Sequence, residues 1–346
     1  MAIPDEMQAL ILTEEGYATA EPTGPYVDDL GTYLTLTRQP VPQPGPGQVL
    51  VKVRLSAVNP SDIHFIKGEY GLPRVKGMAA GFEACGDVVA TGDGADALAG
   101  RRVAFIGSKT GTGAWAEYAL AEAASCVPVP DGIRDEDAAA FFVNPLTAVG
   151  MISLVAEAGS PAVVLTAGAS QLSKLMIGLA ADQGIATIPL VRRANQVEVL
   201  KGLGATHPLD ITAPDFADRF GEVSRAEKPR VLLDAVVDDV SAQIFFGMPN
   251  RTRWVIYGLL DQAPTVLDQV GQFVFTGKRI EGFWLTSWMA SAPKEVVKAA
   301  FGEVMTRFAS GAWATDIQAK VALGEAHQRL GPELMRENIG KVFIHP

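Results

Sequence analysis

Two adjacent arginines, Arg192 and Arg193, directly follow a short apolar segment at residues 185–191. Guanidinium groups bind phosphate well, because their planar N–H donors match the spacing of phosphate oxygens. In an alternating strand and helix fold, a carboxylate after the second strand binds the ribose 2′-hydroxyl of NAD, whereas arginine accommodates the 2′-phosphate of NADP. No carboxylate follows here before Glu198, so the pair favours NADP. The alternative interpretation is a pair of solvated surface arginines.

The segment from Thr166 to Lys174 has the position of a pyrophosphate-binding turn. It lies between an apolar run and a helical pattern, where helix amides and the helix dipole favour an anion. Of the three glycines in the usual G-x-G-x-x-G pattern, only Gly168 is present. The neighbouring residues are small enough for close approach of the backbone, and Ser170 or Ser173 could donate a hydrogen bond to phosphate. The alternative is a tight packing turn.

These two segments require a parallel sheet to position them. Leu172, Leu175, Met176 and Leu179 have the spacing of an amphipathic helix, and Asn195 is the predicted N-cap of the next helix. Short apolar runs, typical of strands buried on both faces, alternate with such helices at residues 162–166, 185–191, 231–236, 254–258 and 280–285. The alternation predicts an α/β fold with a doubly wound parallel (Rossmann) sheet.

The first third of the chain has a different pattern. Residues 48–55, 86–90 and 102–106 are short strand-like runs separated by glycine-containing turns, which predicts a small antiparallel barrel or sheet. We therefore expect a β-rich catalytic domain at residues 1–130 and a cofactor-binding domain at residues 131–285. Residues 286–346 are expected to return to the catalytic domain.

The composition excludes several classes of protein. Among 346 residues, 48% are hydrophobic and the net charge is −10, with no Lys/Arg-rich run, which argues against disorder and against nucleic acid binding. Two cysteines, Cys85 and Cys126, exclude a disulfide scaffold and a four-cysteine zinc site. The start of the chain lacks the pattern of a signal peptide, and the most apolar stretch is too short to span a bilayer. We expect a cytoplasmic protein.

Residues 58–71, taken with Gly81-Phe82-Glu83, resemble the medium-chain dehydrogenase/reductase superfamily. This resemblance implies that the β-rich domain is GroES-like. Zinc-dependent members have a cysteine ligand where this chain has Asn59 and a histidine ligand where it has Phe82. Neither replacement is a usual zinc ligand, and the four histidines show no metal-ligand spacing, so we expect no metal.

Within the zinc-independent branch, the chain is most similar to NADPH-dependent trans-2-enoyl thioester reductases and to quinone oxidoreductases. The resemblance extends over nearly the whole chain. The motifs that carry it, in chain order, are Asn59-Pro60-Ser61-Asp62, Gly68-Glu69-Tyr70-Gly71, Val143-Asn144-Pro145-Leu146-Thr147-Ala148, Val191-Arg192-Arg193, Tyr257-Gly258, Gly282-Phe283-Trp284-Leu285-Thr286-Ser287-Trp288 and Gly340-Lys341.

The resemblance implies a role for each matching residue. Tyr70 corresponds to a tyrosine that assists protonation, and Asn144 to an asparagine near the nicotinamide. The implied NADPH contacts are Asn144, Ala169, Ser170, Gln171, Leu172, Arg192, Arg193, Tyr257, Gly258, Phe283, Trp284, Leu285 and Lys341. A homodimer, formed through the strand near residues 280–285, is also implied.

The chemistry of Tyr70 agrees with that role. Hydride addition to the β-carbon of an enone or enoyl thioester builds negative charge on the carbonyl oxygen and the α-carbon. A phenol, whose pKa is about 10, stays protonated at neutral pH and can donate there. The alternative is an aromatic residue that packs in a turn. Thr147 is a second candidate for polarising the carbonyl, with an ordinary helix position as its alternative.

We therefore predict an NADPH-dependent, zinc-independent oxidoreductase that reduces activated C=C bonds by hydride transfer and protonation. An NADPH quinone oxidoreductase is the alternative among enzymes, and a non-catalytic nucleotide-binding module is the alternative of another class. The expected partners are a small electron-poor alkene or quinone and a second copy of the chain, with no nucleic acid and no membrane.

Overall fold

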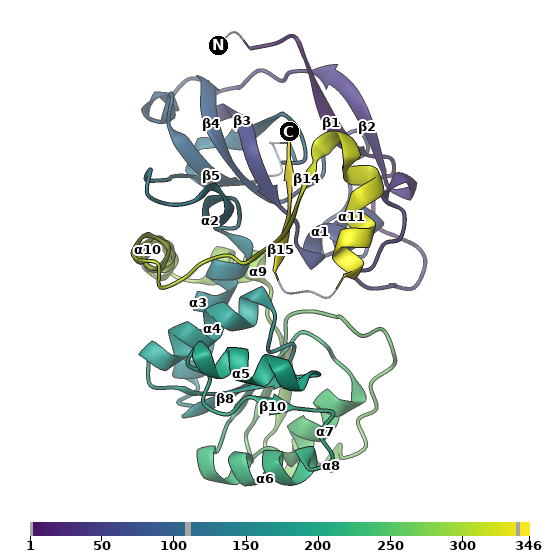
Figure 1. Ribbon diagram of the computed structural model, residues 1–346, viewed down its shortest axis with the longest axis vertical. Coiled ribbons are helices and arrows are strands. Elements are labelled where there is room, and N and C mark those ends of the chain that lie inside the picture. The colour runs from purple at the N-terminus through teal and green to yellow at the C-terminus, as the bar shows by residue number, and fades with distance from the viewer. Residues whose placement is uncertain (1–2, 108–111, 337–339) are drawn as a thin grey trace. The chain divides into compact units, whose positions relative to one another are not determined.

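The computed structural model describes residues 3–107, 112–336 and 340–346. The chain divides into a first unit, Met1–Val143 with Phe308–Pro346, and a second unit, Asn144–Arg307 (Figure 1). The sequence placed these divisions near residues 130 and 285. The first unit extends further because helix α2 (Asp135–Ala139) is bonded to its C-terminal part: Asp137 accepts a hydrogen bond from the Thr315 amide at 2.7 Å.

The first unit is built on a seven-stranded sheet in the order β14-β15-β3-β4-β5-β7, with β6 also paired to β3. Its strands are β3 (Gln48–Ala57), β4 (Glu83–Thr91), β5 (Arg102–Ile106), β6 (Tyr118–Glu122), β7 (Cys126–Pro128), β14 (Ile317–Ala322) and β15 (Lys341–His345). A separate antiparallel pair consists of β1 (Glu6–Leu12) and β2 (Leu34–Pro40). The C-terminal strand β15 lies antiparallel to β3, so the end of the chain completes the sheet begun near its start (Figure 1).

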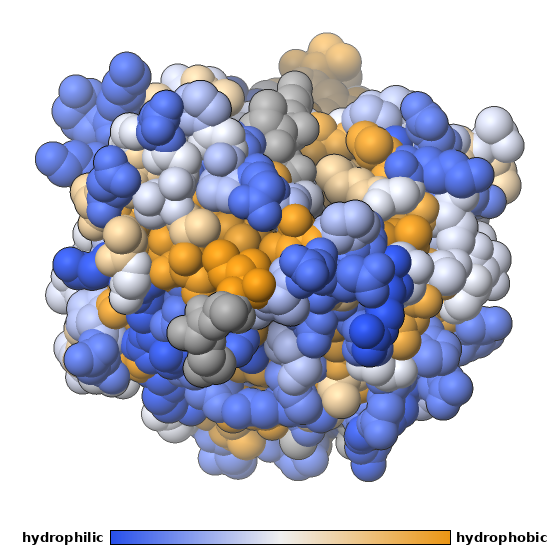
Figure 2. Space-filling model, turned by 90° about the horizontal axis from the view of Figure 1, so that it is seen from above, coloured by the Kyte–Doolittle hydropathy of each residue, from blue (hydrophilic) through white to orange (hydrophobic). Residues whose placement is uncertain are grey.

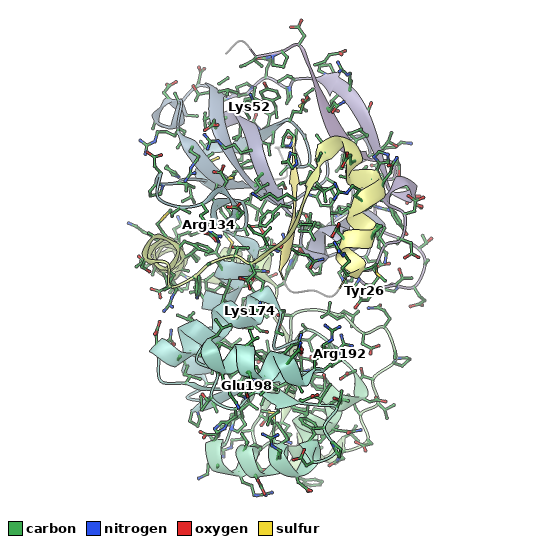
Figure 3. The ribbon with its side chains drawn as sticks, viewed as in Figure 1. Tyr26, Lys52, Arg134, Lys174, Arg192 and Glu198 are labelled. Carbon is green, nitrogen blue, oxygen red and sulfur yellow. The ribbon has the colours of Figure 1, made fainter. Side chains whose placement is uncertain are left out.

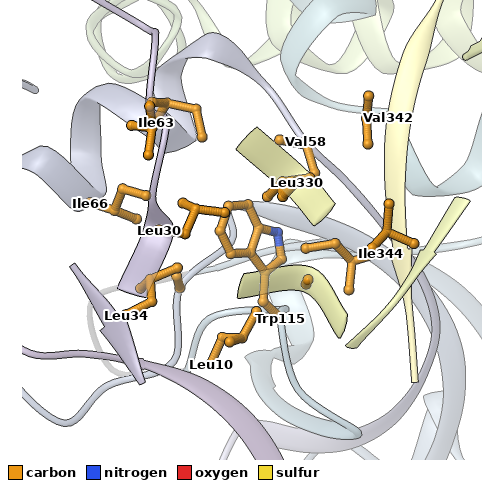
Figure 4. Close-up of a cluster of buried hydrophobic side chains, with 14 of the residues drawn as sticks. Leu10, Leu30, Leu34, Val58, Ile63, Ile66, Trp115, Leu330, Val342 and Ile344 are labelled. Atoms are coloured by element: carbon orange, nitrogen blue, oxygen red, sulfur yellow. The ribbon is translucent and has the colours of Figure 1, made fainter. Parts of the chain in front are cut away.

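A hydrophobic cluster around Trp115 fixes helix α1 (Pro60–Lys67) in this unit (Figure 4). Ile63 and Ile66 on α1 are completely buried in it, as is the Trp115 ring. Helix α11 (Ala326–Met335) packs on the same cluster through Leu330. The face seen in Figure 2 is mostly hydrophilic, with smaller apolar areas between the polar side chains.

The second unit contains six parallel strands in the order β10-β9-β8-β11-β12-β13. They are β8 (Ala162–Leu165), β9 (Ala186–Val191), β10 (Leu209–Asp210), β11 (Val231–Asp234), β12 (Arg253–Ile256) and β13 (Arg279–Gly282). Numbered within this unit, the order is 3-2-1-4-5-6, which is that of a dinucleotide-binding sheet. The order reverses between β8 and β11, and ligands of such sheets bind beyond the carboxyl ends of the strands at this reversal.

Helices precede, connect and follow these strands, and the predicted fold class is confirmed. They are α3 (Val143–Glu157), α4 (Gln171–Asp182), α5 (Ala194–Gly202), α6 (Phe216–Glu227), α7 (Asp239–Gly247), α8 (Gly271–Phe275), α9 (Leu285–Ser291) and α10 (Lys294–Ser310). The predicted N-cap at Asn195 is wrong. The cap is Arg193, whose backbone is extended at φ −146° and ψ 128°, and Asn195 already lies in the first turn. Among the described residues, no helix is both long and apolar enough to cross a membrane.

Candidate active site

The predicted pyrophosphate turn leads from β8 into the N-terminus of α4. Ser170 is the N-cap of the helix, and its Oγ accepts a hydrogen bond from the Ser173 amide at 3.2 Å. Gly168 has no room for a side chain, because a Cβ there would lie 2.7 Å from Pro189 Cβ and 2.9 Å from the Leu190 backbone nitrogen. The one glycine kept from the usual pattern is therefore the one that lets the turn contact β9. Ala169, Ser170, Gln171 and Leu172 are all partly exposed.

The two arginines follow the carboxyl end of β9, as predicted. Both are exposed, and Figure 3 labels Arg192 together with Lys174 of helix α4. Within the described part of the chain, no hydrogen bond or ion pair engages the Arg192 guanidinium. In the adjacent strand, Asp210 Oδ1 accepts hydrogen bonds from the Thr212 amide at 2.9 Å and from Thr212 Oγ1 at 2.7 Å. The end of β9 thus offers a guanidinium group that no described residue engages.

A buried carboxylate at the reversal of strand order escaped sequence analysis. Asp234 ends β11 and is completely buried. Its Oδ1 accepts from Thr166 Oγ1 at 2.6 Å and from the Val236 amide at 2.9 Å, and its Oδ2 accepts from Trp254 Nε1 at 2.8 Å. Asp234 therefore ties the pyrophosphate turn to the loop after β11. Val237 in that loop has φ +64°, a strained conformation for a β-branched residue.

The remaining predicted cofactor residues of this unit follow β12 and β13. Tyr257 and Gly258 directly follow β12, and the phenol of Tyr257 is buried, which raises its pKa together with the charge of Asp234. Phe283 follows β13 and packs against α3, since a Cβ on Gly150 would lie 2.8 Å from its ring. Trp284 is the N-cap of α9 and Leu285 is its first residue. These positions border the carboxyl ends of the strands.

Asn144 and Thr147 lie in the first turns of α3. Asn144 is partly exposed, and Thr147 is 8% exposed. Neither side chain has a hydrogen-bond partner among residues 3–107, 112–336 and 340–346. Their amide and hydroxyl groups thus remain available to a ligand.

Tyr70 follows helix α1 in the first unit. The helix ends at Gly68, which has φ +78°, and a Cβ there would lie 2.6 Å from the Ala18 backbone nitrogen. The partly buried Tyr70 ring stacks at a tilt on Phe82, with centroids 5.3 Å apart. Phe82 in turn contacts Phe65 of α1 at 5.1 Å. Phe82 therefore links the Tyr70 ring to helix α1.

The start of α1 is held by a buried ionic cluster that sequence analysis did not find. The Asn59 amide joins two charges: its Oδ1 accepts from Lys341 Nζ, and its Nδ2 donates to Glu83 Oε1 at 2.9 Å. Asp62 Oδ2 accepts from the Asn59 backbone nitrogen at 2.8 Å. Burial raises the pKa of Asp62 to about 7, raises the pKa of Glu83 and lowers the pKa of Lys341.

Lys341 was predicted to contact the cofactor. The structure places its ammonium among Asn59, Val58 and the nearby carboxylates, with 6% of the residue exposed. Both ends of the Asn59 amide are likewise engaged, and the Phe82 ring packs between two aromatic rings. No group of three or more His, Cys, Asp or Glu in the described residues has the arrangement of a metal site.

Comparison with known proteins agrees with this geometry. Residues 45–131 match the alcohol dehydrogenase GroES-like domain. A solved structure from Mesorhizobium loti, provisionally assigned as an NADPH:quinone reductase, is 50% identical over 100% of both chains with a TM-score of 0.93. The chain belongs to the medium-chain dehydrogenase/reductase superfamily. The predicted superfamily and its GroES-like and Rossmann domains are confirmed.

This medium-chain dehydrogenase/reductase has relatives among both predicted groups of reductases. The mitochondrial enoyl-[acyl-carrier-protein] reductase of Bos taurus is 30% identical over 70% of this chain, which spans 66% of the length of that relative. A mycobacterial structure complexed with NADPH is 25% identical, covers 98% of this chain and 100% of the other, and has a TM-score of 0.77. The chain therefore lies in the branch that contains enoyl and quinone reductases.

Proposed function

We propose that this protein is an NADPH-dependent, metal-independent reductase of activated C=C bonds in enoyl thioesters or enones. Hydride goes to the β-carbon, and a proton goes to the α-carbon. The observation that carries the proposal is the exposed, unengaged Arg192 guanidinium after β9, in a member of a reductase family. The occupied Asn59 amide supports the absence of a metal ligand at that position.

The residues that would hold the cofactor fit its chemistry. Gly168 brings the turn against β9 and leaves the N-terminus of α4 open to a pyrophosphate, and Arg192 with Arg193 would bind the 2′-phosphate. We assign further contacts to Asn144, Ala169, Ser170, Gln171, Leu172, Tyr257, Gly258, Phe283, Trp284 and Leu285. Lys341, whose ammonium is buried against Asn59 and Val58, is left out of this set. When bound, NADPH supplies the hydride.

Tyr70 is the proposed acid. Its phenol stays protonated at neutral pH and would donate to the negative charge that develops on the substrate. Thr147, with a hydroxyl that no described residue engages, would donate to the carbonyl oxygen. Both groups stabilise charge that is present in the transition state and largely absent from the substrate.

Substitution of Tyr70 by Phe tests this role. We expect kcat on enones and enoyl thioesters to fall by about a hundredfold, because general acid catalysis typically contributes that much. Tyr26→Phe, which alters a 49% exposed residue of the same unit, is the matched control. Unchanged turnover of enoyl compounds by Tyr70→Phe would remove Tyr70 as the acid.

Quinone reduction is the second candidate function, and the full-length similarity to the Mesorhizobium loti protein favours it. A reduced quinone carries its charge on oxygens that solvent can protonate, so a side-chain acid is not required. Equal turnover of quinones by the wild type and Tyr70→Phe, in an enzyme inactive on alkenes, would establish this alternative.

The choice of cofactor is tested with Arg192→Ala combined with Arg193→Ala. We expect NADPH affinity to fall by about a hundredfold, with NADH affinity nearly unchanged, because only NADPH carries the 2′-phosphate. Arg219→Ala, at an exposed position on α6, is the control. Equal losses for both cofactors contradict the assignment, and no saturable quenching of tryptophan fluorescence by NADPH would favour a non-catalytic module.

We also propose a homodimer formed through β13. This strand lies at the edge of the sheet, and the preceding helix α8 exposes Val274 by 76% and Phe275 by 86%. Edge strands and exposed apolar side chains are typical of interfaces between copies. The molar mass from light scattering should be that of a dimer for the wild type and of a monomer for Phe275→Asp combined with Val274→Asp. A monomeric wild type rejects the dimer.

A cytoplasmic location is proposed from the two cysteines. Cys85 and Cys126 are buried free thiols, which are compatible with a reducing compartment. Fractionation of cells with an antibody against the protein would test the location, and recovery outside the cytoplasm would reject it.

A further inference from the structure

The buried cluster in the first unit contains more negative than positive groups. Lys341 is 6% exposed, Asn59 is 1% exposed, and Glu83 and Asp62 are completely buried. One ammonium thus faces two carboxylates, and the neutral Asn59 amide connects it to Glu83. An isolated buried charge is costly, so each member of such a cluster depends on the others.

The Asn59 amide can connect these charges in one orientation only. An ammonium group only donates hydrogen bonds, so it requires the amide oxygen. An ionised carboxylate only accepts, so it requires the amide nitrogen. Lys341 on one side and Glu83 on the other therefore fix the direction of the amide.

The cluster is joined to both segments that carry candidate catalytic residues. The other oxygen of Glu83 accepts from the Phe142 amide at 2.9 Å and from the Val143 amide at 3.0 Å, immediately before Asn144. Asn59 is the N-cap of α1, the helix that precedes Tyr70. Asp62 binds the Phe82 amide at 2.8 Å, and the Phe82 ring supports Tyr70.

We propose that Lys341 is a positioning residue, whose ammonium orients the Asn59 amide and thereby the Glu83 carboxylate that holds the chain before Asn144. This role rests on the proposed function and replaces direct contact with NADPH. The Lys341 ammonium provides the positive charge of the cluster whether or not a cofactor is bound. Its loss would displace the groups at the start of α1 and α3 and leave the cofactor phosphates bound as before.

A double-mutant cycle of Lys341→Met and Glu83→Gln tests the link. Each single substitution leaves one end of the Asn59 amide without a matching partner. Lys341→Met leaves Glu83 without its cation, and Glu83→Gln turns an amide NH2 toward the Asn59 NH2, which cannot rotate because Lys341 holds the oxygen. In the double variant, Asn59 is free to rotate and offer its oxygen to the side-chain amide introduced by Glu83→Gln.

We expect each single substitution to lower the melting temperature by about 5 °C or more. The double variant should lose less stability than the two single variants lose together. Lys341→Met should lower kcat about tenfold, through misplacement of the reacting groups, while the Kd for NADPH changes less than twofold. The matched control is Lys320→Met, which removes a surface ion pair between Lys320 on β14 and Glu136. It should leave the melting temperature, kcat and the Kd for NADPH unchanged.

Additive losses in the cycle would overturn the proposed link. A large rise in the NADPH Kd with kcat unchanged would overturn the positioning role and return Lys341 to the cofactor contacts. Turnover by the wild type tests the proposed function separately: a wild type that reduces neither alkenes nor quinones rejects that function, whereas an unfavourable cycle in an active enzyme rejects only this inference.

Discussion

The two units stabilise their buried charges in different ways. In the second unit, Asp234 is surrounded by neutral donors, and Lys278 donates to the carbonyl oxygens of Phe245 at 2.6 Å and Phe246 at 2.8 Å. In the first unit, the charges of Lys341 and Glu83 are joined to each other through one amide. The neutral arrangement makes each buried charge independent, whereas the ionic arrangement makes several segments depend on one lysine.

The difference matters for the parts of the site that each unit supplies. Asp234 organises the turn that would meet the cofactor phosphates, and four neutral donors hold it with no ion pair to a described residue. This buried carboxylate therefore needs no cation of the protein to balance it. In the first unit, the resident ammonium balances carboxylates that hold the backbone.

The largest expected effect is on Asp234. Its replacement by Ala leaves Thr166, Trp254 and two backbone amides without their acceptor, and should reduce the free energy of unfolding by about 4 kcal/mol. Asp234→Asn, which keeps the acceptor for Thr166 and loses the one for Trp254, should lose about half as much. The measurement is denaturant unfolding at pH 7.

The same variants should bind NADPH more weakly, because Asp234 holds the turn that contains Thr166 and the strained loop at Val237. Arg219→Ala again serves as the control for a distant surface change. If Asp234→Ala unfolds with a free energy within about 1 kcal/mol of the wild type, neutral donors contribute little and the contrast between the units fails.

Local features of the chain were predictable for physical reasons. Strand β5 (Arg102–Ile106) has the predicted ends, because a short apolar run between turns specifies a buried strand almost alone. The positions of Gly168 and Arg192 after β8 and β9 were predictable because an apolar run shows where a strand ends, whereas their roles stay a prediction. The N-cap of α5 was missed by two residues, since an arginine with an extended backbone leaves no capping signature.

Contacts between distant residues could not be predicted from one sequence. Lys341 and Asn59 are 282 residues apart, and Thr166 and Asp234 are 68 apart. Lysine, asparagine, threonine and aspartate are all common on protein surfaces, so the residue types alone do not indicate burial. Only the pairing of β15 with β3 brings Lys341 to Asn59 at the start of α1. The resemblance placed Lys341 near the cofactor, but it contained no information about which atoms the ammonium would meet.

The effect expected for Asp62 depends on pH. Burial raises the pKa of Asp62 to about 7, above the ordinary value of 3.8. The folded protein therefore binds this proton more tightly, and the stabilisation present below about pH 4 is lost as the pH rises to about 7. Asp62→Asn removes this titration, so the difference in unfolding free energy between wild type and variant should change by about 4 kcal/mol across that range.

Asp28→Asn, at an exposed position of the same unit, is the control for Asp62 and should leave the pH profile unchanged. A wild-type profile parallel to that of Asp62→Asn between about pH 4 and 7 would show that Asp62 does not titrate there. The ionic arrangement of the first unit would then balance its carboxylates more completely than the burial of Asp62 implies.

The smallest effect is expected for Lys278, a buried lysine that, unlike Lys341, donates only to neutral carbonyl oxygens. Burial lowers the pKa of Lys278 from 10.5 to about 8, so between these values the unfolded chain binds more protons than the folded protein. Stability contributed by this group therefore rises with pH from about 8 to 10.5. Lys278→Met should remove that rise and, at pH 7, cost about 1 kcal/mol through two lost hydrogen bonds, whereas the exposed Lys294→Met should do neither. If Lys278→Met instead costs as much as Lys341→Met, carbonyl acceptors hold a buried ammonium as strongly as carboxylates do, and the two units do not differ in the way proposed.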